Sequence, residues 1–173
     1  SKKIIAWYDN NKRTLPWRVP FNSSQKLYYR LLSEFMLQQT QVKTVIPYFI
    51  RFTNEIKNLK KLSTTSERKV LKLWEGLGYY RRARNLIATA KILVNKKKSV
   101  LPKTLTDIKA LPGIGDYTGN ALLALVYNQP RLALDGNVKR VLSRILNKHE
   151  NKLDFDKIIE KNKRKLFFFK RNS

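Results

Sequence analysis

Two carboxylic acids in contrasting sequence settings are the side chains best suited to acid–base chemistry. Glu34 stands in a helical pattern beside Leu31 and Phe35, where burial would raise its pKa and keep a proton available. Asp135 precedes a predicted helix, whose backbone N–H groups and dipole would keep it ionised. A proton donor and an ionised carboxylate together suit the cleavage of a bond whose transition state places positive charge on a sugar.

Each carboxylate also has an ordinary structural interpretation. A glutamate on a helix is usually solvated, and an aspartate before a helix usually caps it. Capping and charge stabilisation can coexist at Asp135, and the sequence gives no distance between Asp135 and Glu34.

A glycine-rich turn between two helical patterns is a candidate phosphate-binding site. Gly113 and Gly115 belong to the string Leu-Pro-Gly-Ile-Gly-Asp-Tyr-Thr-Gly at 111–119, and they permit a tight turn and a close approach of another chain. Backbone N–H groups at the next helix start, near Thr118, can then face an anion. An ordinary helix–turn–helix connection is the alternative, but the full string in a basic helical chain favours DNA phosphate.

These residues must be positioned by helices, because no alternating pattern is long enough to form a sheet. Helices are expected at about 2–11, 26–38, 41–53, 79–95, 105–110, 116–127, 136–146 and 154–169. A further short helix is expected between an N-cap within 64–66 and a stop at Gly76. Pro47 should kink the third helix or fix its start. Glu34 then lies at the edge of the apolar face of the second helix.

The charge balance favours a polyanionic partner. Lys and Arg number 37 against 12 Asp and Glu, which gives a net charge of +25. Nucleic acid is the first candidate, ahead of an anionic membrane, although biased genome composition explains part of the excess. No apolar run approaches the roughly 18–20 residues of a membrane span, and no signal peptide is recognisable, so neither a membrane partner nor secretion is expected.

The chain has no cysteine and one histidine. Disulfides, thiolate zinc sites and a cysteine-held iron–sulfur cluster are therefore excluded in this chain, and a transition-metal site is not expected. The predicted chemistry consequently uses neither a metal nor a cofactor from this chain.

Five segments, in order, resemble the helix-hairpin-helix DNA glycosylase superfamily, which includes endonuclease III. Besides the hairpin at 111–119, they are Leu-Pro-Trp-Arg at 15–18, Leu-Ser-Glu-Phe-Met-Leu-Gln-Gln-Thr-Gln-Val at 32–42, Trp-Glu-Gly-Leu-Gly-Tyr-Tyr at 74–80 and Leu-Asp-Gly-Asn-Val-Lys-Arg-Val at 134–141. Together they are most similar to the adenine glycosylase (MutY) branch. The resemblance implies base-excision repair by hydrolysis of the N-glycosidic bond of adenine mispaired with 8-oxoguanine or guanine in double-stranded DNA.

The resemblance also implies roles for four residues in the reaction. Glu34 matches the acid that protonates N7 of adenine, and Asp135 matches the aspartate that stabilises the sugar cation. Tyr117 stands where the endonuclease III branch has an imine-forming lysine, and a phenol cannot form that imine. The chain should therefore release a base without cutting the strand, with Tyr117 and Asn137 shaping the site around the water or the sugar.

Four further residues match positions that contact DNA. Gln39 and Tyr79 resemble the family's intercalating and lesion-facing residues, because an amide can bond base edges and an aromatic ring can stack or wedge. Trp17 and Arg18 resemble residues of the adenine pocket. Surface exposure of Gln39 and core packing of Tyr79 or Trp17 are the competing interpretations.

The resemblance implies an all-α helix-hairpin-helix glycosylase fold. We expect a helical barrel at 20–133 that holds the hairpin, and an incomplete second helical module formed by 1–19 and 134–173. Family members continue to a four-cysteine [4Fe-4S] motif, and residues 154–173 do not resemble that continuation. The chain is therefore expected to be C-terminally truncated, monomeric, and bacterial-cytoplasmic, nucleoid-associated or organellar.

Three alternatives remain at this point. The chain could be an inactive, truncated DNA-binding remnant, or another glycosylase of the endonuclease III superfamily with a different lesion. A basic, helical RNA-binding protein is the third. Base release from a mispaired duplex separates the first two from the adenine glycosylase hypothesis, and selective duplex binding excludes the third.

Overall fold

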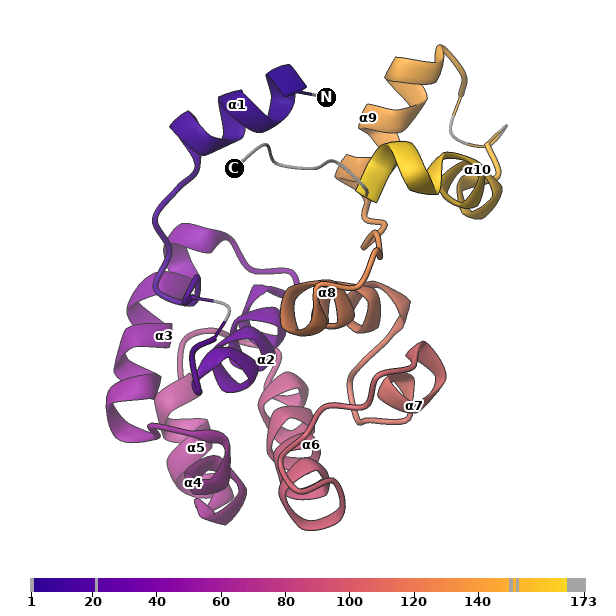
Figure 1. Ribbon diagram of the computed structural model, residues 1–173. Coiled ribbons are helices and arrows are strands. Elements are labelled where there is room, and N and C mark those ends of the chain that lie inside the picture. Colours follow the sequence, from indigo (N-terminus) through magenta and orange to yellow (C-terminus); the bar gives the residue numbers. More distant parts are fainter. Residues whose placement is uncertain (1, 21, 150, 152, 168–173) are drawn as a thin grey trace. The chain divides into compact units, whose positions relative to one another are not determined.

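The structure is a computed structural model that describes residues 2–20, 22–149, 151 and 153–167. Within those ranges it contains α-helices and no strand, which confirms the predicted all-α class (Figure 1). The helices are α1 (Lys2–Asn11), α2 (Lys26–Leu37), α3 (Val42–Glu55), α4 (Leu59–Thr64), α5 (Glu67–Trp74), α6 (Arg81–Lys96), α7 (Leu105–Lys109), α8 (Asp116–Tyr127), α9 (Gly136–Leu146) and α10 (Phe155–Phe167).

The predicted helices are confirmed to within about two residues, with one omission. The short α4 was not expected, and it is capped by the side chain of Asn58, which accepts a hydrogen bond from the Lys61 N–H at 2.8 Å. Pro47 lies inside α3, so the helix does not begin at that residue. The end of the last predicted helix, at 168–169, lies outside the described residues.

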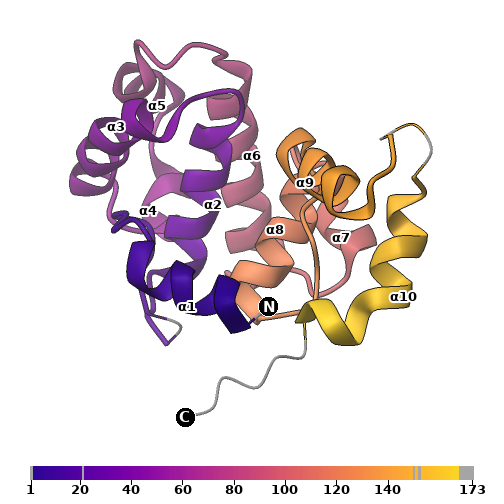
Figure 2. The ribbon, with the colours of Figure 1, turned by 90° about the horizontal axis from the view of Figure 1, so that it is seen from above.

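The chain forms two compact units, residues 1–87 and 88–173. Helix α6 begins in the first unit and continues into the second without interruption (Figure 2). The predicted division into a barrel at 20–133 and a module of both termini concerns how the units assemble, and it stays a prediction.

The core of the first unit is built from aromatic side chains on α2, α3 and α5. Helix α3 packs against both α2 and α5. Phe35, Phe52 and Trp74 are fully buried, and the rings of Phe52 and Trp74 meet edge to face at 6.3 Å. Burying each such side chain stabilises the fold by roughly 2–3 kcal/mol, so this cluster fixes the helix that carries Glu34.

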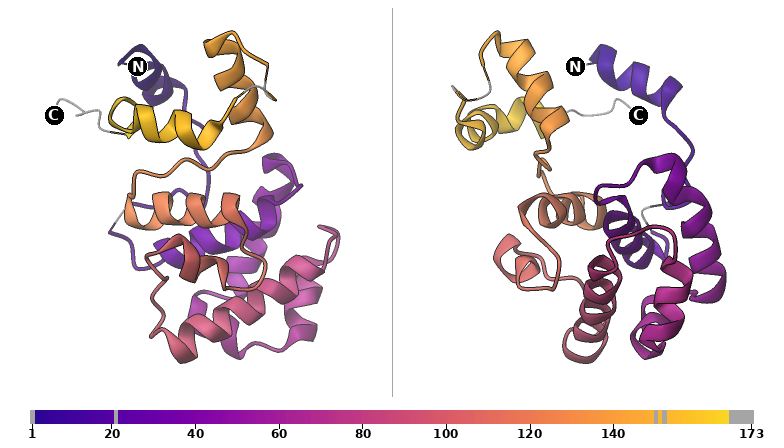
Figure 3. Two further views of the ribbon diagram at one scale, coloured as in Figure 1. Left: turned by 90° about the vertical axis from the view of Figure 1, so that its right-hand side faces the viewer. Right: turned by 180° about the vertical axis from the view of Figure 1, so that it is seen from behind.

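Helix α1 reaches away from the other helices of its unit, as the view from behind shows (Figure 3). Its Ile4 and Trp7 are 68% and 64% exposed. The segment that follows it returns to the core at Trp17, which is buried and meets the Phe49 ring edge-on at 5.3 Å.

The second unit contains the predicted hairpin, in which α7 and α8 pack against each other. Ile108, Leu111 and Ile114 are buried in this hairpin. The Thr89 hydroxyl donates to the Pro112 carbonyl at 3.0 Å and ties the turn to α6. A Cβ on Gly119 would lie 2.9 Å from a Leu105 methyl, so a glycine lets the two helices approach closely.

Helices α9 and α10 follow α8 in the second unit. The Lys139 ammonium of α9 lies 5.6 Å from the centre of the Phe155 ring of α10. Val141 and Ile145 leave an apolar face of α9 exposed, at 52% and 70%. Among the described helices, none combines the length and the apolar character that a bilayer-spanning segment requires.

Candidate functional site

Glu34 lies in the last turn of α2, between Ser33 and Phe35, which are both buried. The carboxyl itself is only partly accessible. Desolvation raises its pKa from 4.5 to about 7, and the positive charge of Arg30 opposes that rise. At neutral pH the protonated and ionised forms of Glu34 therefore coexist, which suits a proton donor.

Arg30 is a residue of this site that the sequence analysis missed. It lies one helical turn before Glu34, and the negative charge of Glu34 raises its pKa against a larger lowering by desolvation. Its Nε is buried without a hydrogen-bond partner. The i, i+4 spacing from Glu34 was the available signal, because residues so spaced share a helix face.

Arg18 brings a further positive charge near Arg30, because its charge lowers the Arg30 pKa. Its guanidinium donates to the Arg13 carbonyl at 2.9 Å and lies 5.8 Å from the Tyr8 ring centre. Trp17 is only 4% exposed, which matches the packing interpretation of that residue. Contact of Trp17 or Arg18 with adenine stays a prediction.

Asp135 is the N-cap of α9, as the sequence indicated. Its Oδ1 accepts the Val138 N–H at 2.7 Å, and its Oδ2 accepts from the Asn137 amide at 3.2 Å. The Asn137 carbonyl oxygen in turn accepts from the Arg140 guanidinium at 2.5 Å. Asp135 and Asn137 therefore belong to one hydrogen-bonded network at the start of α9.

The hairpin glycines have the backbone geometry expected of a tight turn. Gly113 has φ +77°, in the left-handed region, and Gly115 is the N-cap of α8, where an added Cβ would meet no atom within 4 Å. Both are exposed. Thr118 is only 5% exposed, so a contact of its side chain with DNA is the least supported of the predicted hairpin contacts.

A cavity of about 760 Å³ in the second unit brings Tyr117 close to the residues around Asp135. Tyr117 contributes from the start of α8, Leu134 from the loop before α9 and Lys139 from α9 itself. Asp156 and Glu160 of α10 also line it. Tyr117 thus lines the same cavity as Leu134, the residue before Asp135, and the roles of Tyr117 and Asp135 remain predictions.

Gln39 and Tyr79 both occupy exposed, left-handed backbone positions in the first unit. Their φ angles are 56° and 49°, and Tyr79 is 65% exposed. The core-packing alternative for Tyr79 is therefore not supported. Arg82 was not predicted from the sequence. It is buried beside the segments that contain Gln39 and Tyr79, and it donates to the carbonyls of Gln38 and Gly78.

Glu34 belongs to the first unit, and Asp135 and Tyr117 belong to the second. The assembly of these residues into one site is a prediction.

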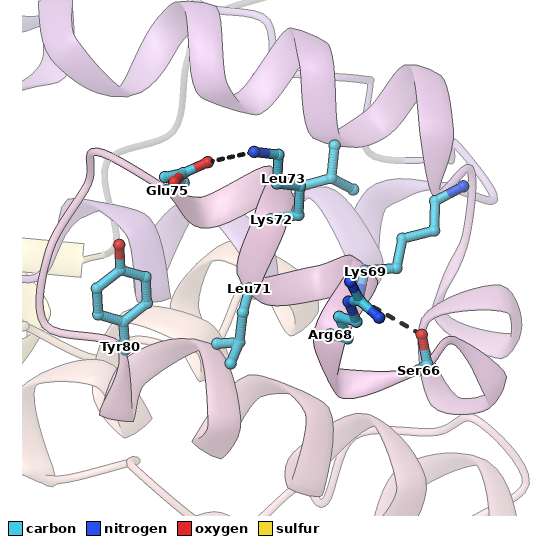
Figure 4. A pocket seen from close by; sticks show the side chains of 8 residues that line it. All are labelled: Ser66, Arg68, Lys69, Leu71, Lys72, Leu73, Glu75 and Tyr80. Atoms are coloured by element: carbon cyan, nitrogen blue, oxygen red, sulfur yellow. Dashed lines mark hydrogen bonds and ion pairs between the residues drawn. The ribbon is translucent and has the colours of Figure 1, made fainter.

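A second cavity, of about 710 Å³, lies in the first unit along α5 (Figure 4). Lys69, Lys72 and Glu75 line it together with Tyr80, and Lys72 and Glu75 form an ion pair at 2.9 Å. This cavity holds none of the predicted site residues, and exposed ion pairs of this kind contribute little. It is therefore not the candidate site.

The described side chains include no group of three His, Cys, Asp or Glu that could bind a metal ion. The whole sequence also lacks cysteine. The four-cysteine [4Fe-4S] cluster implied by the family resemblance therefore does not fit the residues of this chain.

Comparison with known proteins identifies adenine DNA glycosylases as relatives, in agreement with the branch that the sequence motifs resemble. The chain is 43% identical over 159 residues to the adenine DNA glycosylase of Buchnera aphidicola subsp. Baizongia pistaciae. The aligned residues cover 91% of this chain and 44% of that relative. It is 41% identical over 147 residues to the adenine DNA glycosylase of Mus musculus, covering 82% of this chain and 28% of the relative. The chain thus spans less than half the length of these relatives.

The fold has counterparts among solved structures. A thermostable thymine-DNA glycosylase superposes with a TM-score of 0.79 at 23% identity, over 95% of this chain and 75% of that one. The predicted helix-hairpin-helix glycosylase fold is therefore confirmed. The family model of the HhH-GPD superfamily base excision DNA repair proteins matches residues 32–166, more than half of the sequence. The chain belongs to that superfamily.

Proposed function

We propose that the chain is a DNA glycosylase that hydrolyses the N-glycosidic bond of adenine mispaired with 8-oxoguanine or guanine. The observation that carries the proposal is Glu34, a partly buried carboxyl with a pKa of about 7 at the edge of the apolar face of α2. The adenine DNA glycosylase relatives support the choice of base. The net charge of +25 supports double-stranded DNA as the partner.

In the proposed reaction, protonated Glu34 donates its proton to N7 of adenine. The C1′–N9 bond then breaks, its electron pair leaves with the base, and positive charge develops on the sugar. Ionised Asp135 stabilises that charge. Water adds at C1′ and gives its proton to the Glu34 carboxylate, which restores the acid for the next turnover.

Tyr117 and Asn137 are proposed to shape the sugar side of this site. Asn137 donates to the Oδ2 of Asp135 and so limits the directions in which that carboxylate can face. Tyr117 is 45% exposed and lines the cavity next to Leu134. A phenol forms no imine with the sugar, so the product should be an abasic site in an uncut strand.

The test is single-turnover base release from a duplex with adenine opposite 8-oxoguanine, read by strand scission before and after alkali. Scission only after alkali is expected with the wild-type protein. Glu34→Gln should reduce release by at least 100-fold and retain duplex binding. Glu55→Gln is the matched control, because it makes the same change at an exposed glutamate of the same unit.

Each alternative has its own outcome in this experiment. Comparable release by Glu34→Gln and the wild type would remove Glu34 as the acid. Tight duplex binding by folded wild-type protein without release would identify an inactive remnant. A sugar adduct trapped by borohydride would instead indicate imine chemistry of the endonuclease III type, and release of a different damaged base would indicate another lesion preference.

A further inference from the structure

Arg82, at the start of α6, makes an unusual set of contacts. It is only 7% exposed, and its two terminal nitrogens donate to two separate chain segments. Nη1 donates to the first segment, at the end of α2. Its acceptors are the carbonyls of Phe35 at 3.3 Å, Met36 at 2.9 Å and Gln38, and the Thr40 hydroxyl at 3.1 Å. Nη2 donates to the second segment, before α6, at the carbonyls of Leu77 at 3.1 Å and Gly78 at 3.2 Å. A single guanidinium thus joins the end of α2 to the turn before α6.

The two segments have the same kind of backbone strain. Gln39 and Tyr79 are not glycines, yet both have left-handed φ angles, of 56° and 49°. Such a conformation is unfavourable for a residue that carries a Cβ. The carbonyls that Arg82 holds include those of Gln38 and Gly78, the residues immediately before the two strained positions.

Both strained residues present their side chains to solvent. Gln39 is exposed and Tyr79 is 65% exposed, so burial does not offset the backbone cost at either position. The Arg82 guanidinium also lies 5.4 Å from the centre of the Tyr79 ring, where a cation–π contact orients the ring. An amide and an aromatic ring, held on neighbouring turns, form a surface suited to base edges and base faces.

We infer that Arg82 is a positioning residue that couples Gln39 and Tyr79 into one rigid element for opening the DNA base stack. The inference rests on the proposed function, because it concerns how the target base is brought out of the duplex. Arg82 contacts no reacting atom and acts through the two segments.

The cost of burying Arg82 supports a role beyond packing. Its Nε is buried without a hydrogen-bond partner, and desolvation lowers its pKa. Its six acceptors are five carbonyls and one hydroxyl, all of them neutral. A lysine carries its donors on one nitrogen and cannot reproduce a fork that spans two segments, so Arg82→Lys should loosen the coupling and keep the charge.

The test measures base unstacking without requiring catalysis. The probe is a duplex with 2-aminopurine beside a non-cleavable 2′-fluoro-adenosine opposite 8-oxoguanine, followed by fluorescence on mixing. Arg82→Lys should lower the unstacking rate by at least tenfold, with a smaller change in duplex affinity. Arg51→Lys is the matched control, because the Arg51 guanidinium donates to the Leu73 carbonyl at 2.8 Å in the same unit and holds neither segment.

A double-mutant cycle distinguishes positioning from general support of the fold. In a Gln39→Ala or Tyr79→Ala background, Arg82→Lys should have a much smaller effect than in the wild type, because the group through which it acts is gone. Additive effects, or an unchanged unstacking rate in Arg82→Lys, would overturn the inference. Wild-type protein that binds the duplex without any fluorescence change would also overturn it.

If Arg82→Lys does not fold, Thr40→Val tests whether Arg82 positions Gln39 and Tyr79. This substitution keeps the side-chain shape and removes one acceptor of Arg82, the hydroxyl at 3.1 Å. A three- to tenfold slower unstacking, roughly the effect of one lost hydrogen bond, is expected, and an unchanged rate overturns the inference. Failure of the wild type to release adenine while it still unstacks the probe would remove the proposed function and leave the role of Arg82 intact.

Discussion

The surroundings of Glu34 set the pKa of its carboxyl. Helix α2 places it between buried neighbours, and desolvation raises its pKa more than the positive charge of Arg30 lowers it. Asp135, at the start of a helix, instead accepts hydrogen bonds from a backbone N–H and from an amide. The two carboxylates therefore lie in different settings, one partly buried on a helix and the other hydrogen-bonded at a helix start.

The raised pKa of Glu34 predicts a pH-dependent gain in stability for Glu34→Gln. Ionising this glutamate is harder in the folded state than in the unfolded chain, so the wild type loses stability as pH rises through the interval from 4.5 to about 7. Glu34→Gln should therefore raise the free energy of unfolding by up to about 3 kcal/mol at pH 8.5, and by close to zero at pH 4. Urea denaturation at several pH values measures the difference.

Glu55→Gln provides the comparison for that titration. Glu55 is exposed, and its ion pair with Lys69 lowers the Glu55 pKa. Glu55→Gln should therefore give no gain in stability as the pH rises. A stability difference between Glu34→Gln and the wild type that is flat from pH 4 to 8.5 would contradict the environment assigned to Glu34.

Two substitutions at Asp135 should separate capping from catalysis. Asparagine caps helices as well as aspartate does, so Asp135→Asn should keep the stability of α9, whereas Asp135→Ala should lose about 1 kcal/mol. Base release should fall by at least 100-fold in both, because both remove the negative charge. Asp154→Asn is the control, since Asp154 accepts the Lys157 N–H before α10 in a similar way.

Denaturation and single-turnover release, measured on the same preparations, check this pair. Full base release by Asp135→Asn would show that the residue serves only as a cap. A loss of release in Asp154→Asn would show that the assay responds to a general weakening of the second unit.

The residue-scale features differ in how far the sequence could predict them. The Glu34 setting follows from its apolar helical neighbours, and the Asp135 cap follows from its place before a helix. The role of Arg82 did not follow, because its acceptors are backbone carbonyls at the end of α2 and in the turn before α6. Carbonyls occur at every residue, so the sequence carries no mark of which ones an arginine will reach.

At the scale of helices, apolar periodicity and capping residues predicted nine of the ten helices in the part of the chain that the structure describes. Helix α1 was predicted from its apolar residues, yet Ile4 and Trp7 are exposed. Helix α4 has only six residues, and its lysines at 60 and 61 interrupt the apolar pattern. Leu59 and Leu62 are buried there by tertiary packing. The sequence likewise could not place Pro47 inside α3, since a proline is compatible with either a helix start or a kink.

The hairpin predicts different effects on stability for substitutions at Gly119 and Gly115, which lie one helical turn apart. A branched side chain at Gly119 would overlap Leu105 and Ile108, which lie 2.9 and 3.2 Å from a Cβ, so Gly119→Val should destabilise the fold by roughly 1–3 kcal/mol. Gly115→Ala meets no atom within 4 Å and has an ordinary φ of −96°, so the fold should be unaffected. Thermal unfolding tests both.

DNA affinity should show the reverse order for these two variants. A methyl group at Gly115 would stand where the start of α8 is proposed to approach a phosphate, so duplex affinity should fall several-fold. Folded Gly119→Val should bind nearly as well as the wild type, because Gly119 is buried. Unchanged duplex affinity in Gly115→Ala would place the phosphate contact elsewhere.

At the scale of the whole molecule, the acidic residues are too few to balance the basic ones. Even with all 12 acids paired, the basic excess is 25. Three exposed ion pairs of the described residues gather around α5, between Glu55 and Lys69, Glu67 and Arg84, and Lys72 and Glu75. Three of the 12 acidic residues thus form ion pairs around α5, and fewer acidic residues remain to balance the basic residues elsewhere in the chain.

This charge predicts that salt acts on DNA binding and not on the chemical step. Binding through 6–10 phosphate contacts should weaken by roughly 10³–10⁵ between 50 and 200 mM salt, because bound counterions are released from the DNA. Protonation of the base by Glu34 occurs after binding, in a partly buried setting that ions screen weakly. As the salt concentration rises, the protein concentration needed for half-saturation should increase steeply. The rate of single-turnover base release at saturating protein should therefore stay within about twofold.

A release rate at saturation that falls in parallel with affinity would mean that surface charge also orients the target base. Part of the proposed catalysis would then belong to the basic surface and not to Glu34 and Asp135.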